Sequence, residues 1–378
     1  MRILTITNCP ALEHLGSGYI IARFVAGMRS LGHQVELLEP EHYEVLPRLR
    51  PRANSYRQAL GMFLALWRAL RSDSYDLVEF WGGESWLAIE WLTRQRGGRP
   101  LVVQHTNGPE PRYSQMLEAA GLLKLTPLQR WISYGLVPKA FRSPDAVVTI
   151  SRYDRDWLEA RGWPGSRKTQ AIEVPLAECF LGRTAGRRSS RIIGFCGTWL
   201  AKKGLGVMVP DLTRLLREFE DWQFLVLGTG PEAGVQSSFP PDIRSRVEVM
   251  AMIKDKETLA QQYERMEIFV LPSWIESFGI ALAEAMACGC APVTTPVGFG
   301  ASLEDGQDAL LLEKAESPLL YEAVKRLILN PGLRSEIAGK ARQRVQELRW
   351  ENAVLSLSNI YGTWLTEHRI RSQQSPHS

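Results

Sequence analysis

Short β-rich runs alternate with longer helical patterns along almost the whole chain, and this alternation most constrains the fold. In the first half, strands are expected at 2–7, 34–38, 76–80, 100–105 and 145–151. Helical patterns lie between them, among them 18–31, 55–71 and 84–96. Unbroken apolar strands separated by helices are typical of parallel sheets covered on both faces. The pattern predicts a doubly wound α/β domain.

The stretch LGRTAGRRSSR is basic, rich in small residues and turn-prone, which predicts a linker at 181–190. The alternation then restarts, with strands expected at 191–197, 222–228, 246–250, 266–272, 290–295 and 309–313. Helices are expected at 205–219, 256–264, 278–288, 317–329 and 332–347. The predicted order is a domain over 1–180, the linker, a domain over 191–349, a helix over 350–368 that packs back on the first domain, and a flexible tail over 369–378. Open α/β sheets bind ligands at the carboxyl ends of their strands. Two such domains facing across a cleft would hold a two-part ligand.

Composition excludes several classes of function. The net charge of +4 over 378 residues gives no argument for a nucleic-acid partner. The five cysteines form no zinc-type pattern, and their odd number does not favour a disulfide framework, so a reducing compartment is expected. The apolar runs are too short for a secretory signal or a membrane span. We therefore expect a cytoplasmic protein, or one that lies peripherally at the inner face of a membrane.

Residues 272–290, PSWIESFGIALAEAMACGC, hold two carboxylates, Glu276 and Glu284, separated by seven uncharged residues. The run from Phe278 to Gly289 is typical of a helix of small and apolar residues that ends at the glycine. Its exposed N–H groups would form an anion site, and the carboxylates would accept hydrogen bonds from sugar or ribose hydroxyls. A buried helix with capping or surface glutamates explains the same pattern, so this stretch alone leaves both interpretations open.

Two further turns follow strands of the second domain. In GFCGTWLAKKGLGVMV (194–209), Gly197 permits close backbone approach, and Lys202 or Lys203 can reach a phosphate. A solvated lysine pair is the alternative, although cations are not the favoured charge at the start of a helix. In FLVLGTGPE (224–232), Gly228 indicates no more than a strand-ending turn when read alone.

Taken together and in order, these motifs resemble the retaining glycosyltransferases of family 4, which have the GT-B fold. That family shows a strand with Gly-Arg-Leu and Lys-Gly, then a Val-Gly-x-Gly-Pro turn, then a Glu-x7-Glu motif. This chain has Gly197 and Lys203-Gly204 at the family spacing, LGTGPE, and Glu276 and Glu284 in the Glu-x7-Glu frame. The stretch VTTPVGFGASLEDGQDALLLE resembles the family's continuation, so the match runs over 191–313.

The resemblance implies roles for individual residues. Glu276 would bind hydroxyls of the donor sugar, Glu284 would bind the ribose, and Lys203 would neutralise the diphosphate leaving group. The donor would also contact the backbone of Ser277, Phe278, Gly279 and Ile280. One position departs from the family, because Thr198 stands where an arginine usually follows the first glycine. Stabilisation of the diphosphate would then depend on Lys203, on Lys202 and on the start of the helix.

The resemblance implies that the first domain is the acceptor side and the second is the nucleotide-sugar donor side. The first domain resembles the family more weakly. Its loop HLGSGYIIARFVAGMRSLGHQVELL (14–38) fits the glycine-containing loop after the first strand, so Gly16 and Gly18 would approach the donor phosphates or the acceptor. The run VVQHTNGPE (102–110) resembles the strand-ending histidine motif and places His105 beside the donor sugar. A structural histidine is the alternative. The family's usual Asn-Gly after the next strand is replaced by EVPLAECF (173–180).

The stretch VLPRLRPRANSYRQALGMFLALWRALR (45–71) carries arginines, no acid, and the interleaved apolar residues Met62, Phe63, Leu66 and Trp67. Contact with anionic lipid or a lipid-linked acceptor is one interpretation. We favour the other, an amphipathic helix whose apolar side faces the core.

The predicted reaction is transfer of a hexose or related sugar from a nucleotide-diphosphate donor to an acceptor hydroxyl with retention of configuration, in glycan, polysaccharide or glycolipid biosynthesis. The acceptor class includes glycans, lipid-linked sugars and small molecules. No metal or other cofactor is expected, because the chain shows no DxD-type motif in the candidate site and Lys203 would carry the positive charge. Two alternatives remain: a nucleotide-sugar epimerase of the same fold, and a weakly active or inactive subunit that binds sugar nucleotides, for which Thr198 is the best support.

Overall fold

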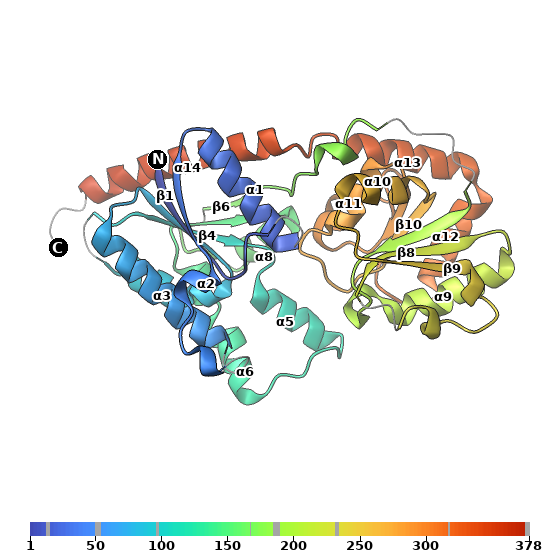
Figure 1. Cartoon of the computed structure of the whole chain (residues 1–378), viewed down its shortest axis with the longest axis horizontal. Helices are drawn as coiled ribbons and strands as arrows, with labels where there is room; N and C mark the ends of the chain where they lie inside the picture. Colours follow the sequence, from blue (N-terminus) through green and yellow to red (C-terminus); the bar gives the residue numbers. More distant parts are fainter. Residues whose placement is uncertain are drawn as a thin grey trace. The chain divides into compact units, whose positions relative to one another are not determined.

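The structure is a computed structural model that describes residues 1–12, 16–49, 54–95, 98–166, 168–183, 190–230, 234–316 and 318–374. The chain divides into two compact units (Figure 1). The N-terminal unit comprises Met1–Glu118, Leu123–Val174 and Trp350–Ser378, and the C-terminal unit comprises Ala119–Leu122 and Pro175–Arg349. The division therefore falls at Pro175 and not after residue 180 as predicted. Most of the predicted linker, 184–189, lies outside the described residues.

The N-terminal unit contains a six-stranded sheet with the strand order β2-β1-β3-β4-β5-β6, in which all neighbours are parallel. Its strands are β1 (Arg2–Thr7), β2 (Gln34–Leu38), β3 (Leu77–Trp81), β4 (Leu101–Thr106), β5 (Ala146–Thr149) and β6 (Thr169–Ala171). Its helices are α1 (Gly16–Ser30), α2 (Pro40–Tyr43), α3 (Asn54–Ser72), α4 (Trp86–Thr93), α5 (Glu110–Ala119), α6 (Pro127–Trp131), α7 (Lys139–Arg142), α8 (Arg152–Glu159) and α14 (Trp350–Gln374). Strands β3 and β4 are buried at every position, as expected for central parallel strands. The three-residue strand β6 was not predicted, since so short a run carries no pattern.

The C-terminal unit repeats this architecture with the strand order β12-β11-β10-β7-β8-β9, again all parallel. Its strands are β7 (Ile192–Cys196), β8 (Gln223–Thr229), β9 (Val247–Ala251), β10 (Ile268–Leu271), β11 (Ala291–Thr294) and β12 (Leu310–Leu311). Its helices are α9 (Leu205–Glu218), α10 (Lys256–Glu264), α11 (Ile280–Ala287), α12 (Leu319–Leu329) and α13 (Pro331–Val345). Helices flank both faces of the sheet, with α10 and α13 beside α11, and α9 beside α12 (Figure 1). The prediction of doubly wound α/β architecture is confirmed in both halves.

The last helix, α14, belongs to the N-terminal unit and contacts α1 and β4. It runs to Gln374, so the predicted flexible tail over 369–378 is wrong for residues 369–374. Side chains near its end have fixed partners, since Arg369 donates to Asp76 at 2.6 Å and His368 bonds the carbonyl of Arg99 at 3.0 Å. These contacts explain why the polar end stays helical.

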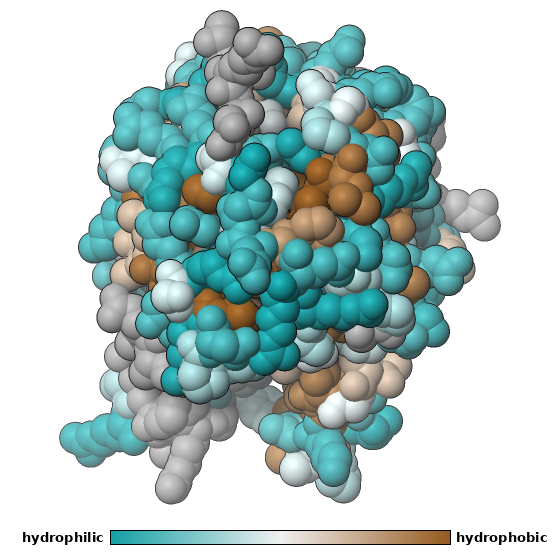
Figure 2. Space-filling view, turned by 90° about the vertical axis from the view of Figure 1, so that its right-hand side faces the viewer, coloured by the Kyte–Doolittle hydropathy of each residue, from teal (hydrophilic) through white to brown (hydrophobic). Residues whose placement is uncertain are grey.

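Helix α3 carries most of the basic stretch over 45–71, and residues 50–53 of that stretch lie outside the described residues. Met62 and Leu66 are fully buried in the core of the N-terminal unit, whereas Trp67 is exposed and lies under the Arg71 guanidinium. The predicted core-facing helix is confirmed for Met62 and Leu66. No described helix has the length and apolarity needed to cross a membrane. On the face shown in Figure 2 the hydrophobic residues form small patches within a mainly hydrophilic surface.

Candidate functional site

The C-terminal sheet has a topological switch point between β7 and β10. From β7 the chain adds β8 and β9 on one side, and it then returns to add β10, β11 and β12 on the other. Loops that leave two neighbouring parallel strands in opposite directions open a crevice at the carboxyl edge, where sheets of this class bind ligands. The two loops at this switch point, 197–204 and 272–279, carry most of the predicted site residues.

The Lys203 and Glu276 side chains meet at this switch point. Lys203 Nζ donates to Glu276 Oε1 at 2.5 Å, and the hydroxyl of Ser273 donates to the same oxygen at 2.7 Å. The two charged side chains are only 17% and 12% exposed, so water screens the pair little. A cation and a carboxylate are therefore held together, partly shielded, where a ligand of this fold would lie.

Glycine at position 204 explains how the two loops approach so closely. Gly204 has φ +83°, and a Cβ on it would lie 2.0 Å from the carbonyl oxygen of Pro272. Next to it, the N–H of Trp274 donates to the carbonyl of Lys202 at 2.9 Å. The Lys-Gly motif thus supplies the cation and the backbone contact that brings it to Glu276. Lys202 contributes its carbonyl to this contact, and its side chain is half-buried.

Glu284 lies on α11 and is held by α10. The Tyr263 hydroxyl donates to its Oε2 at 3.1 Å, and Lys256 Nζ lies 3.2 Å from its Oε1. Burial raises the pKa of Glu284, and the neighbouring Lys256 partly offsets this effect. Burial also raises the pKa of Cys196, at the end of β7, to about 12, with the Glu284 charge as a second cause. Glu284 therefore faces the end of β7, but both of its oxygens already have partners. The sequence analysis missed Lys256 and Tyr263, because neither has a fixed spacing from the two glutamates.

Two glycines, Gly197 directly after β7 and Gly228 near the end of β8, form a small glycine surface at the ends of these strands. The N–H of Gly197 donates to the carbonyl of Leu227 at 2.9 Å, and a Cβ on Gly228 would lie 3.7 Å from the nitrogen of Gly197. Both glycines have positive φ, at +145° and +71°. Thr198 follows as an exposed residue. These positions are brought together at the same edge as Lys203.

The helix after β10 starts later than predicted. Gly279 adopts φ +87°, so α11 begins at Ile280 and not at Phe278. Phe278 is instead buried in the turn, with its ring 5.0 Å from that of Phe299. Ser277 is buried as well, and Ile280 is the first residue of the helix. Fewer N–H groups than predicted therefore belong to the helix start.

The loop after β11 contacts this turn and stabilises it. The N–H of Phe299 donates to the carbonyl of Phe278 at 2.7 Å. Gly298 has φ +58°, and a Cβ on it would lie 2.6 Å from the same carbonyl and 3.0 Å from Glu276 Cβ. The VGFG run that resembles the family's continuation therefore holds the backbone of Glu276 in place.

In the N-terminal unit, Gly16 and Gly18 lie in the first turn of α1. A Cβ on Gly18 would lie 2.3 Å from the carbonyl oxygen of Pro10, so this glycine allows the loop after β1 to pack against the helix. A Cβ on Gly16 would meet no described atom within 4 Å. Packing explains Gly18, whereas Gly16 stays a predicted ligand-binding position.

The structure does not support the predicted role of the His105 imidazole beside a donor sugar. His105 is 1% exposed, and its ring stacks on Trp81 with 4.3 Å between the centroids. Its Nε2 lies 2.5 Å from the hydroxyl of Tyr361 on α14 and 3.4 Å from Glu79 Oε2. Burial lowers the pKa of His105 to about 3, so the ring is neutral. The structural alternative explains this histidine, because its ring is enclosed within its own unit.

Polar residues that the sequence analysis missed gather at the carboxyl edge of the N-terminal sheet. Glu110, at the start of α5, accepts from the N–H of Gly83 at 2.8 Å, and burial raises its pKa to about 8. Asp154 accepts from Arg112 at 3.0 Å. Glu110 Oε2 and Asp154 Oδ2 are buried and have no hydrogen-bond partner among the described residues. No motif links these residues, which lie on the separate helices α5 and α8.

The described residues hold one grouping with the ligand types of a metal site, Glu39, Glu41 and His42 on and beside α2. These groups already have structural partners, since His42 Nδ1 accepts from the N–H of Glu39 at 3.0 Å and Glu39 accepts from the N–H of Ala11 at 2.7 Å. Glu39 and His42 form the capping box of the short helix α2.

Comparison with known proteins gives a match in each half of the chain. Residues 190–330 match the family described as "Glycosyl transferases group 1", and residues 16–170 match "Glycosyltransferase Family 4". The chain is 26% identical to a D-inositol 3-phosphate glycosyltransferase of Actinosynnema mirum over 320 residues, which cover 76% of this chain and 72% of that protein. It is also 26% identical to a phosphatidyl-myo-inositol mannosyltransferase of Mycolicibacterium smegmatis over 226 residues, which cover 57% and 56%.

Solved structures show the same fold at low sequence identity. A sucrose-phosphate synthase from Thermosynechococcus elongatus superposes with a TM-score of 0.77 and 17% identity, covering 97% of this chain and all of that one. Anabaena HepE, solved with UDP-glucose, superposes with a TM-score of 0.64 and 14% identity, covering 96% and 100%. The predicted fold class of two Rossmann-like domains is confirmed.

Proposed function

The chain belongs to the group 1 and family 4 glycosyltransferases, and from this premise we propose that it transfers a sugar from a nucleotide-diphosphate donor to an acceptor hydroxyl with retention of configuration. The observation that carries the proposal is the ion pair of Lys203 and Glu276 at the switch point of the C-terminal sheet. One partner suits a diphosphate and the other suits sugar hydroxyls, so a single donor molecule matches both.

The pair gives a mechanism for charge stabilisation. In the absence of a donor, Glu276 holds the Lys203 ammonium at the site and out of bulk water. A bound diphosphate would draw the ammonium to itself as negative charge develops on the leaving group. Preorganised positive charge in a shielded site is worth more than the same charge in water. Glu276 would then be released to accept hydrogen bonds from the hydroxyls of the donor sugar.

We assign the nucleoside end of the donor to Glu284. Two ribose hydroxyls would compete with Tyr263 and Lys256 for its carboxylate. Because Glu284 is nearly fully buried, donor binding requires Lys256, which is 34% exposed, to move aside or to share the oxygen. The glycine surface at Gly197 and Gly228 would take the phosphates, and Thr198 would contribute its hydroxyl in place of a guanidinium.

We further propose that the reaction needs no metal ion or other cofactor, since Lys203, Lys202 and the start of α11 would supply the positive potential at the diphosphate. The chemistry proposed is front-face attack, in which the leaving phosphate accepts the proton of the acceptor hydroxyl. This route explains retention without a protein nucleophile.

The relatives act, by name, on inositol 3-phosphate and phosphatidyl-myo-inositol, and HepE was solved with UDP-glucose. These names support a hexosyl donor and an acceptor from glycan or glycolipid biosynthesis. Peripheral contact of residues 45–71 with an anionic membrane, and a cytoplasmic location, stay part of the proposal. Trp67, Arg68 and Arg71 are exposed on α3 and would be available for such contact.

The test is a thermal-shift screen of the full chain against nucleotide sugars, followed by hydrolysis and transfer assays with the best donor. We expect one class of nucleotide sugar to raise the melting temperature, and Lys203→Ala and Glu276→Ala to lower turnover by about 100-fold or more. Lys340→Ala, which changes an exposed lysine on α13, is the matched control. Donor binding without turnover over a wide acceptor panel would favour the inactive subunit. Conversion of the donor to its epimer would favour the epimerase.

A further inference from the structure

A pocket in the N-terminal unit contains an unsatisfied buried cation. Arg57, on α3, is 6% exposed and closes one wall of a cavity of about 400 Å³. Its Nε donates to the carbonyl of Val45 at 2.9 Å, and its Nη2 donates to Glu44 at 2.5 Å. The third nitrogen, Nη1, is buried and has no hydrogen-bond partner among the described residues. A buried donor without a partner is unfavourable, so its presence beside a cavity requires an explanation.

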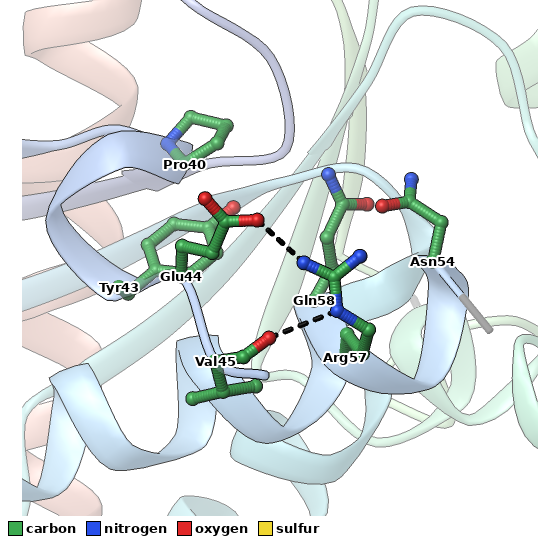
Figure 3. Close-up of a pocket in the computed structure, with 7 residues that line it drawn as sticks. All are labelled: Pro40, Tyr43, Glu44, Val45, Asn54, Arg57 and Gln58. Atoms are coloured by element: carbon green, nitrogen blue, oxygen red, sulfur yellow. Dashed lines mark hydrogen bonds and ion pairs between the residues drawn. The ribbon is translucent and has the colours of Figure 1, made fainter. Parts of the chain in front are cut away.

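Besides Arg57 and Glu44, the pocket is lined by the polar Tyr43, Asn54 and Gln58 and by the apolar Pro40 and Val45. Figure 3 shows the amides of Asn54 and Gln58 side by side, with the remaining guanidinium nitrogen of Arg57 on their side of the pocket. Amides both donate and accept hydrogen bonds. The pocket therefore offers a donor at Nη1 and mixed donors and acceptors next to it, which together suit a ligand that does both.

The charge of the pocket argues against an anion as its preferred ligand. Glu44 already neutralises the Arg57 guanidinium through a close ion pair in which the Arg57 side chain is 5% exposed. A phosphate or carboxylate would meet that glutamate as well as the arginine. A neutral hydroxylated ligand meets no such repulsion, because its oxygens accept from Nη1 and its hydroxyl hydrogens donate to amide oxygens and to Glu44.

The pocket also lies where an α/β sheet binds ligands. Gln58 Nε2 donates to the carbonyl of Asn8, the residue after β1, at 3.1 Å. Tyr43, which lines the pocket, donates its hydroxyl to the carbonyl of Thr7 at the end of β1. The strand order of this sheet places its switch point between β1 and β3. The pocket thus adjoins the carboxyl edge at the switch point, and its volume falls in the range of small-molecule sites.

We propose that this pocket binds a neutral sugar ring of the acceptor, with a ring hydroxyl oxygen accepting from Arg57 Nη1 and the amides of Asn54 and Gln58 bonding neighbouring hydroxyls. The acceptor is then a carbohydrate-bearing molecule. This inference rests on the proposed function, because only a transferase has an acceptor. Binding of the sugar itself does not depend on catalysis.

The direct experiment measures binding of methyl glycosides of glucose, mannose and galactose to the full chain by saturation-transfer NMR, with inorganic phosphate in a parallel arm. At least one of the three glycosides should bind. Any other glycoside that binds should compete with it. Arg57→Met should weaken binding about tenfold or more, the effect expected for a hydrogen bond to a charged donor.

A second variant controls for misfolding, since loss of Arg57 also removes the ion pair with Glu44. Asn54 is exposed at the start of α3, so Asn54→Ala should keep the melting temperature of the wild type and still weaken glycoside binding several-fold. Gln95→Ala, at an exposed position beyond the end of α4, is the matched amide control and should change neither quantity. Unchanged glycoside binding in Asn54→Ala and Arg57→Met would overturn the inference. The inference would also be overturned if phosphate bound in a manner that depends on Arg57 and no glycoside bound.

The two proposals fail in different ways. If nucleotide-sugar binding depends on Lys203 and Glu276 while no glycoside binds at Arg57, only the acceptor inference is wrong. If glycosides bind and the donor variants behave as the wild type, the pocket stands and the proposed donor site is wrong.

Discussion

The carboxyl edges of the two sheets treat their polar groups in opposite ways. At the C-terminal edge the two glutamates are satisfied, Glu276 by Lys203 and Glu284 by Lys256 and Tyr263. At the N-terminal edge the buried Glu110 Oε2 and Asp154 Oδ2 have no partner among the described residues, and the same holds for Arg57 Nη1 beside the end of β1. The C-terminal edge has one such atom, Thr229 Oγ1 at the end of β8.

This difference determines how each edge would respond to a ligand. A ligand at the C-terminal edge has to replace existing partners, so its net binding energy is the difference between two sets of contacts. A ligand at the N-terminal edge supplies partners that are missing, so each new hydrogen bond also removes a desolvation penalty. Charges that change partners suit a reacting group, whereas unsatisfied atoms suit recognition of a ground-state molecule.

The largest effect is expected for Lys203→Ala. Loss of this cation removes the fixed positive charge at the proposed diphosphate position, and kcat/KM for transfer should fall about 10²- to 10³-fold, the range found for loss of one preorganised charge-stabilising group. Steady-state kinetics with the donor from the thermal-shift screen measures it.

Lys256→Ala is the comparison within the same edge. It removes the cation beside Glu284 but leaves Lys203 in place, so we expect a change in the KM for the donor of about tenfold and a smaller change in kcat. Equal losses of kcat in both variants would contradict the separate roles given to the two lysines.

The next effect concerns Tyr361, which ties α14 to the N-terminal sheet. Its hydroxyl donates to Glu79 and contacts Nε2 of His105, and all three residues are buried. Tyr361→Phe should lower the free energy of unfolding by about 1–3 kcal/mol, because Glu79 and His105 lose a buried partner. Urea denaturation measures the change. Thr363→Ala, at an exposed position on α14, keeps this network and should have the smaller effect. If Tyr361→Phe were neutral, the network would not be needed to hold α14.

The sequence predicted the C-terminal edge better than the N-terminal edge for a physical reason. Lys203 and Glu276 each lie within a short motif of glycines and small residues, and neighbouring parallel strands bring such motifs to one edge without further information. Strand and helix positions were predicted for the same reason, since buried runs and amphipathic periods are local signals.

What the sequence did not reveal depends on long-range packing. The enclosure of His105 depends on Tyr361, which lies 256 positions later in the chain. The pairing of Glu284 with α10 and the extension of α14 to Gln374 likewise depend on contacts between distant segments. The pocket at Arg57 shows no motif, since its residues come from two helices and the connection between them.

The pH dependence of stability should test the buried carboxylate at the N-terminal edge. Burial raises the pKa of Glu110 from its ordinary 4.5 to about 8, so the folded protein binds a proton that the unfolded chain has released in this window. The free energy of unfolding should therefore be highest below pH 4.5 for this group and should fall as pH rises to about 8, by up to roughly 5 kcal/mol. Glu110→Gln should flatten this slope, as measured by denaturation at several pH values.

His105 changes the free energy of unfolding with pH in the opposite direction over part of the same pH range. Burial lowers its pKa to about 3, so its contribution is present above the ordinary value of 6.5 and is lost as pH falls toward 3. The difference between Glu110→Gln and wild type isolates the glutamate, since His105 is the same in both. Glu159→Gln, at an exposed position on α8, should keep the wild-type slope. An unchanged slope in Glu110→Gln would show that Glu110 titrates normally.

The smallest effect is expected for Gly16→Ala, and its sign decides what the first glycine of α1 does. A Cβ at this helical position meets no described atom within 4 Å, so the substitution should stabilise the fold by about 0.4–1 kcal/mol through the entropy of the unfolded chain. Gly18→Ala is the contrast, because its Cβ would lie 2.3 Å from the Pro10 carbonyl and should destabilise. If Gly16→Ala stabilises the fold but lowers transfer, the space beside Gly16 belongs to a ligand, and the N-terminal edge contributes backbone to the site as well as side chains. If both stability and transfer rise or stay level, the predicted ligand contact at Gly16 is wrong.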